Sequence, residues 1–180
     1  MKNNFPRVMK ATAVITGAMT VCFALLHHLF ANEWLLTAAI SAGTTCYHFA
    51  MRLLVGRLVP PVQGTSRWFR AKRWEAPFYR FLGVKGWKQH FPAYDPRQFS
   101  LEENTLRQVI RNTCGAEVVH EVIMLCSFLP LVSVPLFGAF WVFFITSTLS
   151  ALFDSLFVMI QRYNRPRLER IAQKQQCAEM

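Results

Sequence analysis

The sequence predicts an all-α integral membrane protein with about four transmembrane helices, an interfacial amphipathic segment and a cytoplasmic helix. Hydrophobic residues make up 53% of the 180, and they gather in long runs. Residues 11–32 and 34–51 contain no Lys, Arg, Asp or Glu, and residues 122–161 contain only Asp154. A run of about 20 uncharged residues matches a hydrocarbon core roughly 30 Å thick. By its length the chain, residues 1–180, is expected to form a single membrane domain.

The uncharged runs place the expected spans at about residues 8–30, 34–57, 116–135 and 139–161, with a cytoplasmic and interfacial segment at 59–115. The first run follows a few basic residues, as a signal peptide would, but its apolar part is too long, so we expect it to stay as a span. The last run covers about 40 residues, roughly twice what one spanning helix needs. Its break is expected at Pro130, Pro135 and Gly138.

The net charge of +10 indicates topology before it indicates a partner. Three of the twenty Lys and Arg residues lie at or before Lys10, twelve lie at 52–111 and five at 162–174. The turns at 32–33 and 135–138 contain none. The positive-inside rule therefore predicts a multi-pass protein of the cell membrane with both termini in the cytoplasm. Anionic lipid headgroups are the expected counter-charge, and a nucleic-acid partner is not expected.

The five cysteines include no CxxC pair, so the sequence supports neither a disulfide framework nor a zinc site. No metal and no resident cofactor is expected. Buried, reduced thiols are the simpler interpretation of the cysteines inside the spans.

The second span has a polar face near its cytoplasmic end, because His48 and Arg52 are i,i+4 neighbours. They either pack the spans together, with Arg52 reaching lipid phosphate, or contact a substrate. Asp154 lies deep in the fourth span, where an ionised group is costly. We expect it to pair with a polar group such as His48 or with a bound substrate.

The segment after the second span alternates aromatic and cationic residues, which is typical of an element lying in the membrane plane. Anchoring is one interpretation, and binding of a phosphate-bearing donor is the other. Trp87 and Lys88 near its end are candidate substrate-binding residues. Ser100 and Glu103 then form a candidate capping box that would start a cytoplasmic helix.

That helix is expected to bring Glu117, His120 and Glu121 to the mouth of the third span. At i, i+3 and i+4 the three side chains share one helix face. Two carboxyls and an imidazole entering a span are costly, so a functional site is the default hypothesis. The fourth span ends in QRYNRPRL at residues 161–168, where Pro166 is expected to end or kink the helix.

Five strings together resemble one bacterial family: WFRAKRWE (68–75), YRFLGVKGWK (79–88), YD (94–95), AEVVHE (116–121) and QRYNRPRL (161–168). The family is the glycosyl-4,4'-diaponeurosporenoate acyltransferases, CrtO-type membrane enzymes. The resemblance implies a small integral membrane protein that esterifies a fatty acyl chain onto a glycolipid-like hydroxyl. It covers residues 68–168. Glu117 and His120 match the family's A-E-x-x-H motif, and Glu121 falls outside it.

Acyl transfer needs a base for the alcohol proton and donors for the developing oxyanion. We expect His120 to be the base, with Glu117 or Glu121 orienting its imidazole as in a catalytic triad. Gln161, Arg162, Asn164 and Arg165 are expected to bind substrate, with the two arginines and the asparagine as donors for oxyanion or phosphate. The lipid-linked acceptor would meet an acyl donor: an acyl-coenzyme A, an acyl carrier protein or a phospholipid. No serine lies in a nucleophile elbow, so direct transfer is favoured.

Three other interpretations stay open. Glu117-x-x-His120 has the spacing of di-iron bundles, but these need two such motifs, and HExxH is excluded because position 124 is Met124. A small lipid-modifying methyltransferase lacks a Gly-rich nucleotide loop here. A non-catalytic membrane adaptor would use the polar face only to pack spans together.

Overall fold

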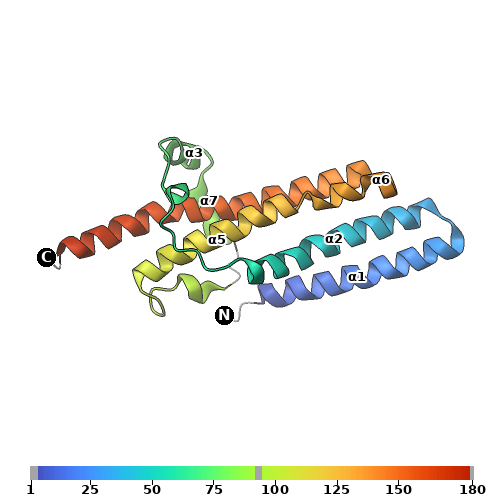
Figure 1. Cartoon of the computed structure of the whole chain (residues 1–180), viewed down its shortest axis with the longest axis horizontal. Coiled ribbons are helices and arrows are strands. Elements are labelled where there is room, and N and C mark those ends of the chain that lie inside the picture. Colours follow the sequence, from blue (N-terminus) through green and yellow to red (C-terminus); the bar gives the residue numbers. More distant parts are fainter. Residues whose placement is uncertain (1–3, 92–94, 179–180) are drawn as a thin grey trace. The chain divides into compact units, whose positions relative to one another are not determined.

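The computed structural model describes residues 4–91 and 95–178 (Figure 1). Every regular element within them is helical and none is a strand, which confirms the predicted all-α class. The α-helices are α1 (Phe5–Phe30), α2 (Glu33–Leu58), α3 (Glu75–Phe81), α4 (Val84–Trp87), α5 (Leu106–Cys126), α6 (Val134–Phe137) and α7 (Phe140–Ala178). Short 3-10 helices are η1 (Arg67–Phe69), η2 (Lys88–His90), η3 (Pro96–Phe99) and η4 (Leu129–Ser133).

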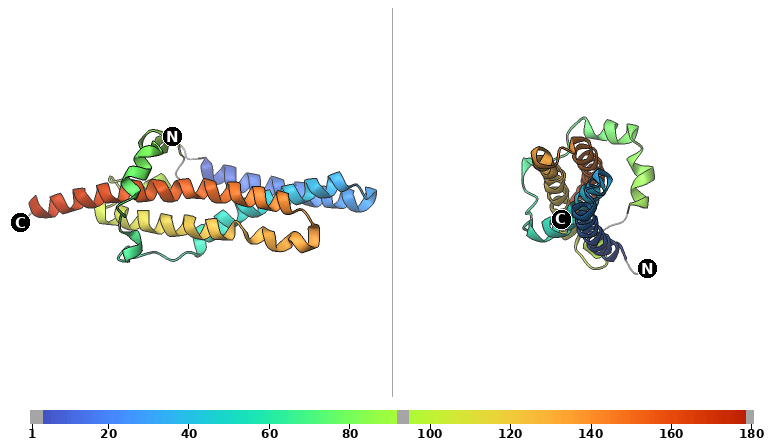
Figure 2. Two further views of the ribbon diagram at one scale, coloured as in Figure 1. Left: turned by 90° about the horizontal axis from the view of Figure 1, so that it is seen from above. Right: turned by 90° about the vertical axis from the view of Figure 1, so that its right-hand side faces the viewer.

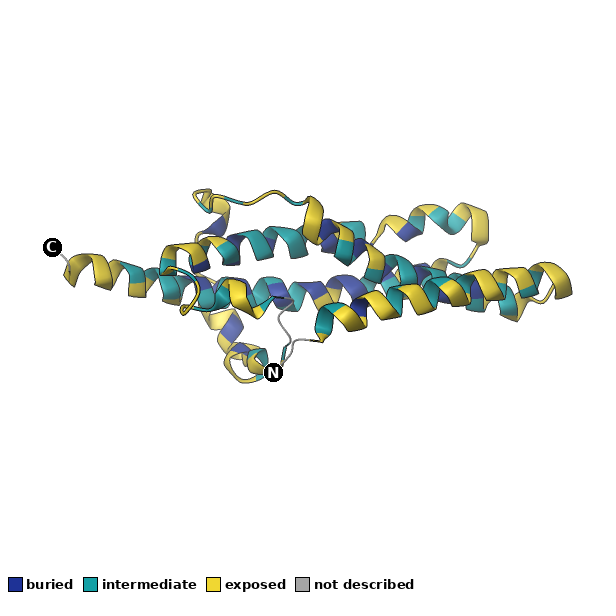
Figure 3. Ribbon diagram, turned by 90° about the horizontal axis from the view of Figure 1, so that it is seen from below, coloured by how far each residue is buried: buried dark blue, intermediate teal, exposed yellow. Residues whose placement is uncertain are grey.

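Three helical stretches of the described residues are long and apolar enough to cross a membrane: Phe5–Phe30, Leu106–Phe137 and Phe140–Ala178. The first, α1, leaves most of its apolar side chains exposed, and only Met9 is buried (Figure 3). An apolar surface of this extent on one helix suits contact with lipid rather than with water. The fold therefore confirms a membrane protein, while a fourth span at α2 stays a prediction.

The chain divides into two compact units. The first contains Met1–Leu58 and Val122–Asp154, and the second contains Val59–Glu121 and Ser155–Met180. Helices α5 and α7 contribute residues to both units. The expectation of a single membrane domain stays a prediction, and each unit is described by itself below.

In the first unit, α1 and α2 form an antiparallel hairpin (Figure 2). The turn is made by Ala31, which has a left-handed backbone (φ 49°) and donates its N–H to the carbonyl of His27. The two helices approach closely at glycine, since a Cβ on Gly17 would lie 3.3 Å from the Cys46 sulfur. That thiol donates to the Ala13 carbonyl at 3.2 Å. Small residues at a helix contact are a common way of packing spans.

The predicted break between the third and fourth spans lies where helices end. Helix α5 ends at Cys126, nine residues before the expected end at 135, and η4 and α6 carry the chain to Gly138. Gly138 has φ 65°, a left-handed conformation that glycine adopts without strain. The prolines at 130 and 135 each start a short helical piece, where their missing N–H costs nothing.

The sequence predicted that the helix would end or kink at Pro166. It does not end there, because Pro166 lies inside helix α7. Proline removes one N–H from the helix ladder, but tertiary contacts can hold the helix across it. Arg162 and Arg165, just before the proline, are both fixed by ion pairs. The helix continues to Ala178.

The start of α5 differs from the sequence prediction as well. Ser100 and Glu103 do not form the capping box, and Ser100 instead accepts a hydrogen bond from the N–H of Glu102 in a turn. The box is made five residues later by Thr105 and Gln108. The Gln108 side chain accepts from the Thr105 N–H at 2.8 Å, and the Thr105 hydroxyl accepts from the Gln108 N–H at 3.3 Å.

Candidate functional site

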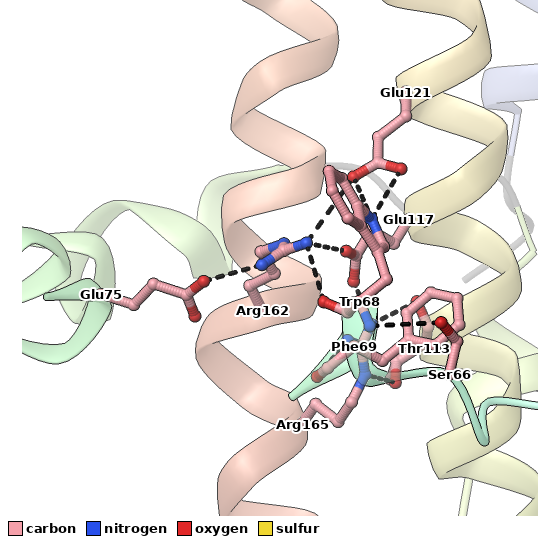
Figure 4. Close-up of polar contacts among 9 residues, drawn as sticks. All are labelled: Ser66, Trp68, Phe69, Glu75, Thr113, Glu117, Glu121, Arg162 and Arg165. Atoms are coloured by element: carbon pink, nitrogen blue, oxygen red, sulfur yellow. Dashed lines mark hydrogen bonds and ion pairs between the residues drawn. The ribbon is translucent and has the colours of Figure 1, made fainter. Parts of the chain in front are cut away.

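The centre of the second unit is a buried carboxylate, Glu117 on α5, with a side chain that is 0% exposed (Figure 4). One of its oxygens, Oε2, pairs with Nη2 of Arg165. The other, Oε1, lies 2.7 Å from Nη2 of Arg162. Both arginines come from α7, so the pairs join α5 to α7 within this unit. A buried carboxylate with two guanidinium partners is a strongly held arrangement, because charges rarely lie buried unpaired.

Arg165 is itself only 1% exposed, and its donors meet protein acceptors. Its Nε donates to the Thr113 hydroxyl at 3.0 Å, and Nη2 donates to the Thr113 carbonyl at 3.1 Å. Nη1 donates to the Phe69 carbonyl at 3.2 Å, and the guanidinium lies 5.1 Å from the Phe69 ring centroid. Arg165 therefore joins three segments: α7, α5 and the η1 turn.

Arg162 is the second guanidinium of the cluster. Its Nη1 donates to Glu75 Oε1 at 2.7 Å, and Nη2 donates to the Trp68 carbonyl at 3.3 Å. Its guanidinium carbon lies 5.3 Å from the Trp68 ring centroid. Glu121 lies 3.8 Å from Nη2, and both of its oxygens accept from the Trp68 indole N–H, at 3.0 and 3.1 Å. Three carboxylates thus surround two guanidiniums, with a formal charge of −1 (Figure 4).

The predicted base, His120, lies half-buried on α5. Its imidazole stacks on the ring of Phe157, with centroids 4.6 Å apart and planes 7° from parallel. Phe157 is buried, and Phe91 packs edge-on against it at 5.6 Å. The aromatic contact fixes the plane of the imidazole. The predicted i, i+3 relation of Glu117 and His120 holds, since both lie within the continuous helix α5.

Two further candidates of the second unit, Lys88 and Trp87, differ in the segments that they contact. Lys88 Nζ donates to Asn164 Oδ1 at 2.5 Å and lies 4.8 Å from the Tyr163 ring centroid. Burial, and secondarily the charge of Arg167, lowers the pKa of Lys88. Trp87, by contrast, donates its indole N–H to the Leu82 carbonyl of its own segment. Gln161 is buried on α7. Tyr94, part of one of the strings that resemble the family, lies outside the described residues.

The remaining candidates, His48, Arg52 and Asp154, belong to the first unit. Arg52 pairs with Asp154 at 2.5 Å and donates to the Ser150 hydroxyl at 2.8 Å. Asp154 is 1% exposed. The sequence predicted His48 or a substrate as the partner of Asp154, and the structure gives Arg52. His48 is buried with its ring edge-on to Tyr47, and neither of its ring nitrogens makes a hydrogen bond within the part of the chain described.

Sequence reasoning missed four residues that complete the cluster of the second unit: Trp68, Phe69, Glu75 and Thr113. For one of the four, Glu75, the sequence contained a clue that it belongs to the site. Glu75 is the only carboxylate between Glu33 and Asp95, in a stretch otherwise rich in Lys and Arg. A lone acid in such a stretch points to a specific cation as its partner. Trp68 and Phe69 also accept from the arginines through their backbone carbonyls, which no residue type reveals. Among residues 4–91 and 95–178, no group of three or more His, Cys, Asp and Glu could hold a metal ion.

Comparison with known proteins gives one result. A family model described as glycosyl-4,4'-diaponeurosporenoate acyltransferase matches residues 65–174, more than half of the chain. No curated protein and no solved structure matches. The matched range contains His120 and the whole Glu117 cluster, which consists of Trp68, Phe69, Glu75, Thr113, Glu117, Glu121, Arg162 and Arg165.

Proposed function

Because the chain belongs to the glycosyl-4,4'-diaponeurosporenoate acyltransferase family, we propose that it moves a fatty acyl chain onto a hydroxyl of a membrane glycolipid-like acceptor. His120 is the proposed general base. The observation that carries this proposal is the position of His120. It lies one helical turn from Glu117, the residue that ties α5 to α7, inside the range that the family matches. The reaction needs an acyl donor and no resident cofactor.

In the proposed step, the His120 imidazole takes the proton of the acceptor hydroxyl. The acceptor oxygen forms a bond to the acyl carbonyl carbon, and the bond from that carbon to the leaving group of the donor breaks. The imidazolium then returns its proton to the leaving group. Stacking on Phe157 supports this role, because it holds the ring in one plane while leaving the half-buried His120 accessible.

Glu117 and Glu121 are proposed as positioning residues. The oxygens of Glu117 meet Arg165 and Arg162, and those of Glu121 meet the Trp68 indole. The cluster fixes the rotation of α5, and thereby the direction in which His120 points. Arg162 and Arg165 are proposed as positioning residues too, because their guanidinium N–H groups already donate to protein acceptors.

The test is lipid mass spectrometry of host membranes containing the wild type, His120→Ala or His90→Ala at matched expression. His90 is an exposed histidine of η2, so its loss controls for removing an imidazole. We expect an acylated species with the wild type and His90→Ala, and none with His120→Ala. Full product from a folded His120→Ala variant would exclude this base. If no species distinguished any sample from empty vector, with acceptor present, a non-catalytic adaptor would be the better interpretation.

A further inference from the structure

A cavity of 470 Å³ lies in the second unit beside the Glu117 cluster. Helix α3, the start of α4 and the part of α7 after Gln161 line it. Six of its lining residues are cations: Lys72, Arg80, Lys85, Arg162, Arg167 and Arg170. Glu75 is the one carboxylate among the lining residues. Six positive charges and one negative give the walls a formal charge of +5.

Five of these six cations are exposed to solvent, and one is held inside the protein. Arg162 is occupied, because it pairs with Glu75 and Glu117. The other five are exposed. Two of these already contact aromatic side chains, since Lys72 Nζ lies 5.2 Å from the Trp68 ring centroid and Arg167 Nη2 donates to the Tyr163 hydroxyl at 2.5 Å. Within the described residues, Arg80, Lys85 and Arg170 make no ion pair with a carboxylate. Like charges brought together around one concavity repel each other, so their arrangement favours an anionic occupant.

The wall of the cavity also carries two aromatic side chains, Tyr79 and Tyr163. Tyr79 is buried, and burial together with the charge of Glu75 raises its pKa to about 12, so its phenol stays protonated at neutral pH. The Tyr163 ring packs edge-on to it at 6.4 Å, and the Arg167 guanidinium lies 4.1 Å from the Tyr163 centroid. Lys and Arg beside planar rings are a usual surface for phosphate groups attached to an aromatic base.

The size and charge of the cavity discriminate between anionic ligands. Its volume lies within the roughly 300–1,000 Å³ typical of sites for small molecules. A lipid headgroup brings one phosphate, which two or three cations would satisfy. A carrier protein would meet a broad surface rather than a concavity. Coenzyme A brings three phosphates, which suits the five exposed cations of this cavity.

We propose that this cavity binds the phosphate groups of an acyl-coenzyme A, which is then the acyl donor. The inference rests on the proposed function, because a donor site has meaning only for an acyl transferase. No new chemical step is added: the thioester carbon receives the acceptor oxygen, and the coenzyme A sulfur leaves with the proton held by His120.

The test is titration of the purified full-length protein, in detergent, with coenzyme A, dephospho-coenzyme A and inorganic phosphate, followed by calorimetry. The variants are Arg80→Gln with Arg170→Gln, and Arg107→Gln as the matched control. Arg107 is an exposed arginine of α5 that does not line the cavity. We expect saturable binding of coenzyme A. Dephospho-coenzyme A, which lacks one phosphate, should bind about tenfold or more weakly, because hydrogen bonds between charged groups are the strong ones. The double variant should lose binding of coenzyme A, and Arg107→Gln should not.

Three outcomes would overturn the proposal. The first is that coenzyme A does not bind, or binds no more tightly than inorganic phosphate. The second is that Arg107→Gln weakens binding as much as the double variant, which would indicate general surface charge. The third is that vesicles of phosphatidylglycerol, but not of phosphatidylcholine, displace the coenzyme, which would make a lipid headgroup the occupant. Transfer measured by mass spectrometry separates the two proposals: product formed without coenzyme A binding refutes the donor site alone. His120→Ala should lose product and keep binding.

Discussion

The most informative perturbation of this fold is Glu117→Gln. The substitution keeps the shape of the side chain and removes its charge. Arg162 would retain Glu75 as a partner at 2.7 Å. Arg165 would retain only neutral acceptors, the hydroxyl and carbonyl of Thr113 and the carbonyl of Phe69. The cost therefore falls on Arg165, which is 1% exposed and would become a buried cation without a carboxylate among the described residues.

The magnitude follows from the burial of both partners. Removing one member of a buried ion pair costs about 3–5 kcal/mol, because the other charge stays buried without compensation. Glu121→Gln is the matched control on the same helix. The Glu121 side chain is 26% exposed, its guanidinium partner is 3.8 Å away, and glutamine can still accept from the Trp68 indole. We expect this control to cost less than about 1 kcal/mol.

The assay is reversible unfolding in mixed micelles with increasing sodium dodecyl sulfate, followed by tryptophan fluorescence. Trp68 is a built-in probe, since it contacts both Arg162 and Glu121. Adding Arg165→Met to Glu117→Gln should restore part of the lost stability, because the stranded cation is removed. The reasoning is refuted if Glu117→Gln destabilises the protein no more than Glu121→Gln, or if the double variant is less stable than Glu117→Gln alone.

Three further predictions concern other parts of the chain. Asp154→Asn should lower the free energy of unfolding by about 3 kcal/mol or more in the same assay, because Arg52 then lacks its carboxylate partner. Adding Arg52→Met should recover part of the lost stability, and unchanged stability in Asp154→Asn would contradict the pairing. Thr105→Val should cost about 1 kcal/mol by loss of the cap at α5, and a variant as stable as wild type would show that Gln108 alone holds the helix start. Stability should fall from about pH 10 to pH 12, because the raised pKa of Tyr79 means that the folded state holds a proton that the unfolded state releases. Thermal unfolding at several pH values should show a flatter fall for Tyr79→Phe than for wild type.

The helices of the first unit were the easiest to predict. Residues 8–30 and 34–57 were expected, and the structure gives Phe5–Phe30 and Glu33–Leu58. The uncharged runs carry this information directly, because bilayer thickness fixes their length. Helices α5 and α7 were harder. They continue beyond the apolar runs at 122–161 into charged sequence, where internal ion pairs replace lipid as the partner of the side chains.

The sequence predicted some residues of the candidate site, but not the pairing between them. The helix period correctly placed Glu117, His120 and Glu121 within one helix, and the fixed spacing of α7 placed Arg162 and Arg165 together. The pairing of these two groups depends on how α5 and α7 pack in the second unit, which is tertiary information. The sequence also could not reveal that backbone carbonyls of residues 68 and 69 complete the arginine sites.

The string QRYNRPRL gains its meaning from the rotation of α7. A helix turns by about 100° per residue, so Arg162 and Arg165 lie on one face, while Tyr163, Arg167 and Arg170 lie on another. The first pair reaches the carboxylate of Glu117, and the second set lines the cavity. Arg162 and Arg165 therefore form internal ion pairs, while Arg167 and Arg170 only line the cavity, which Arg162 lines as well. Pro166 is compatible with both, because it lies between the faces and the helix continues through it to present Arg167 and Arg170. A break at this proline would remove Arg167 and Arg170 from the cavity while leaving the pairs of Glu117 in place.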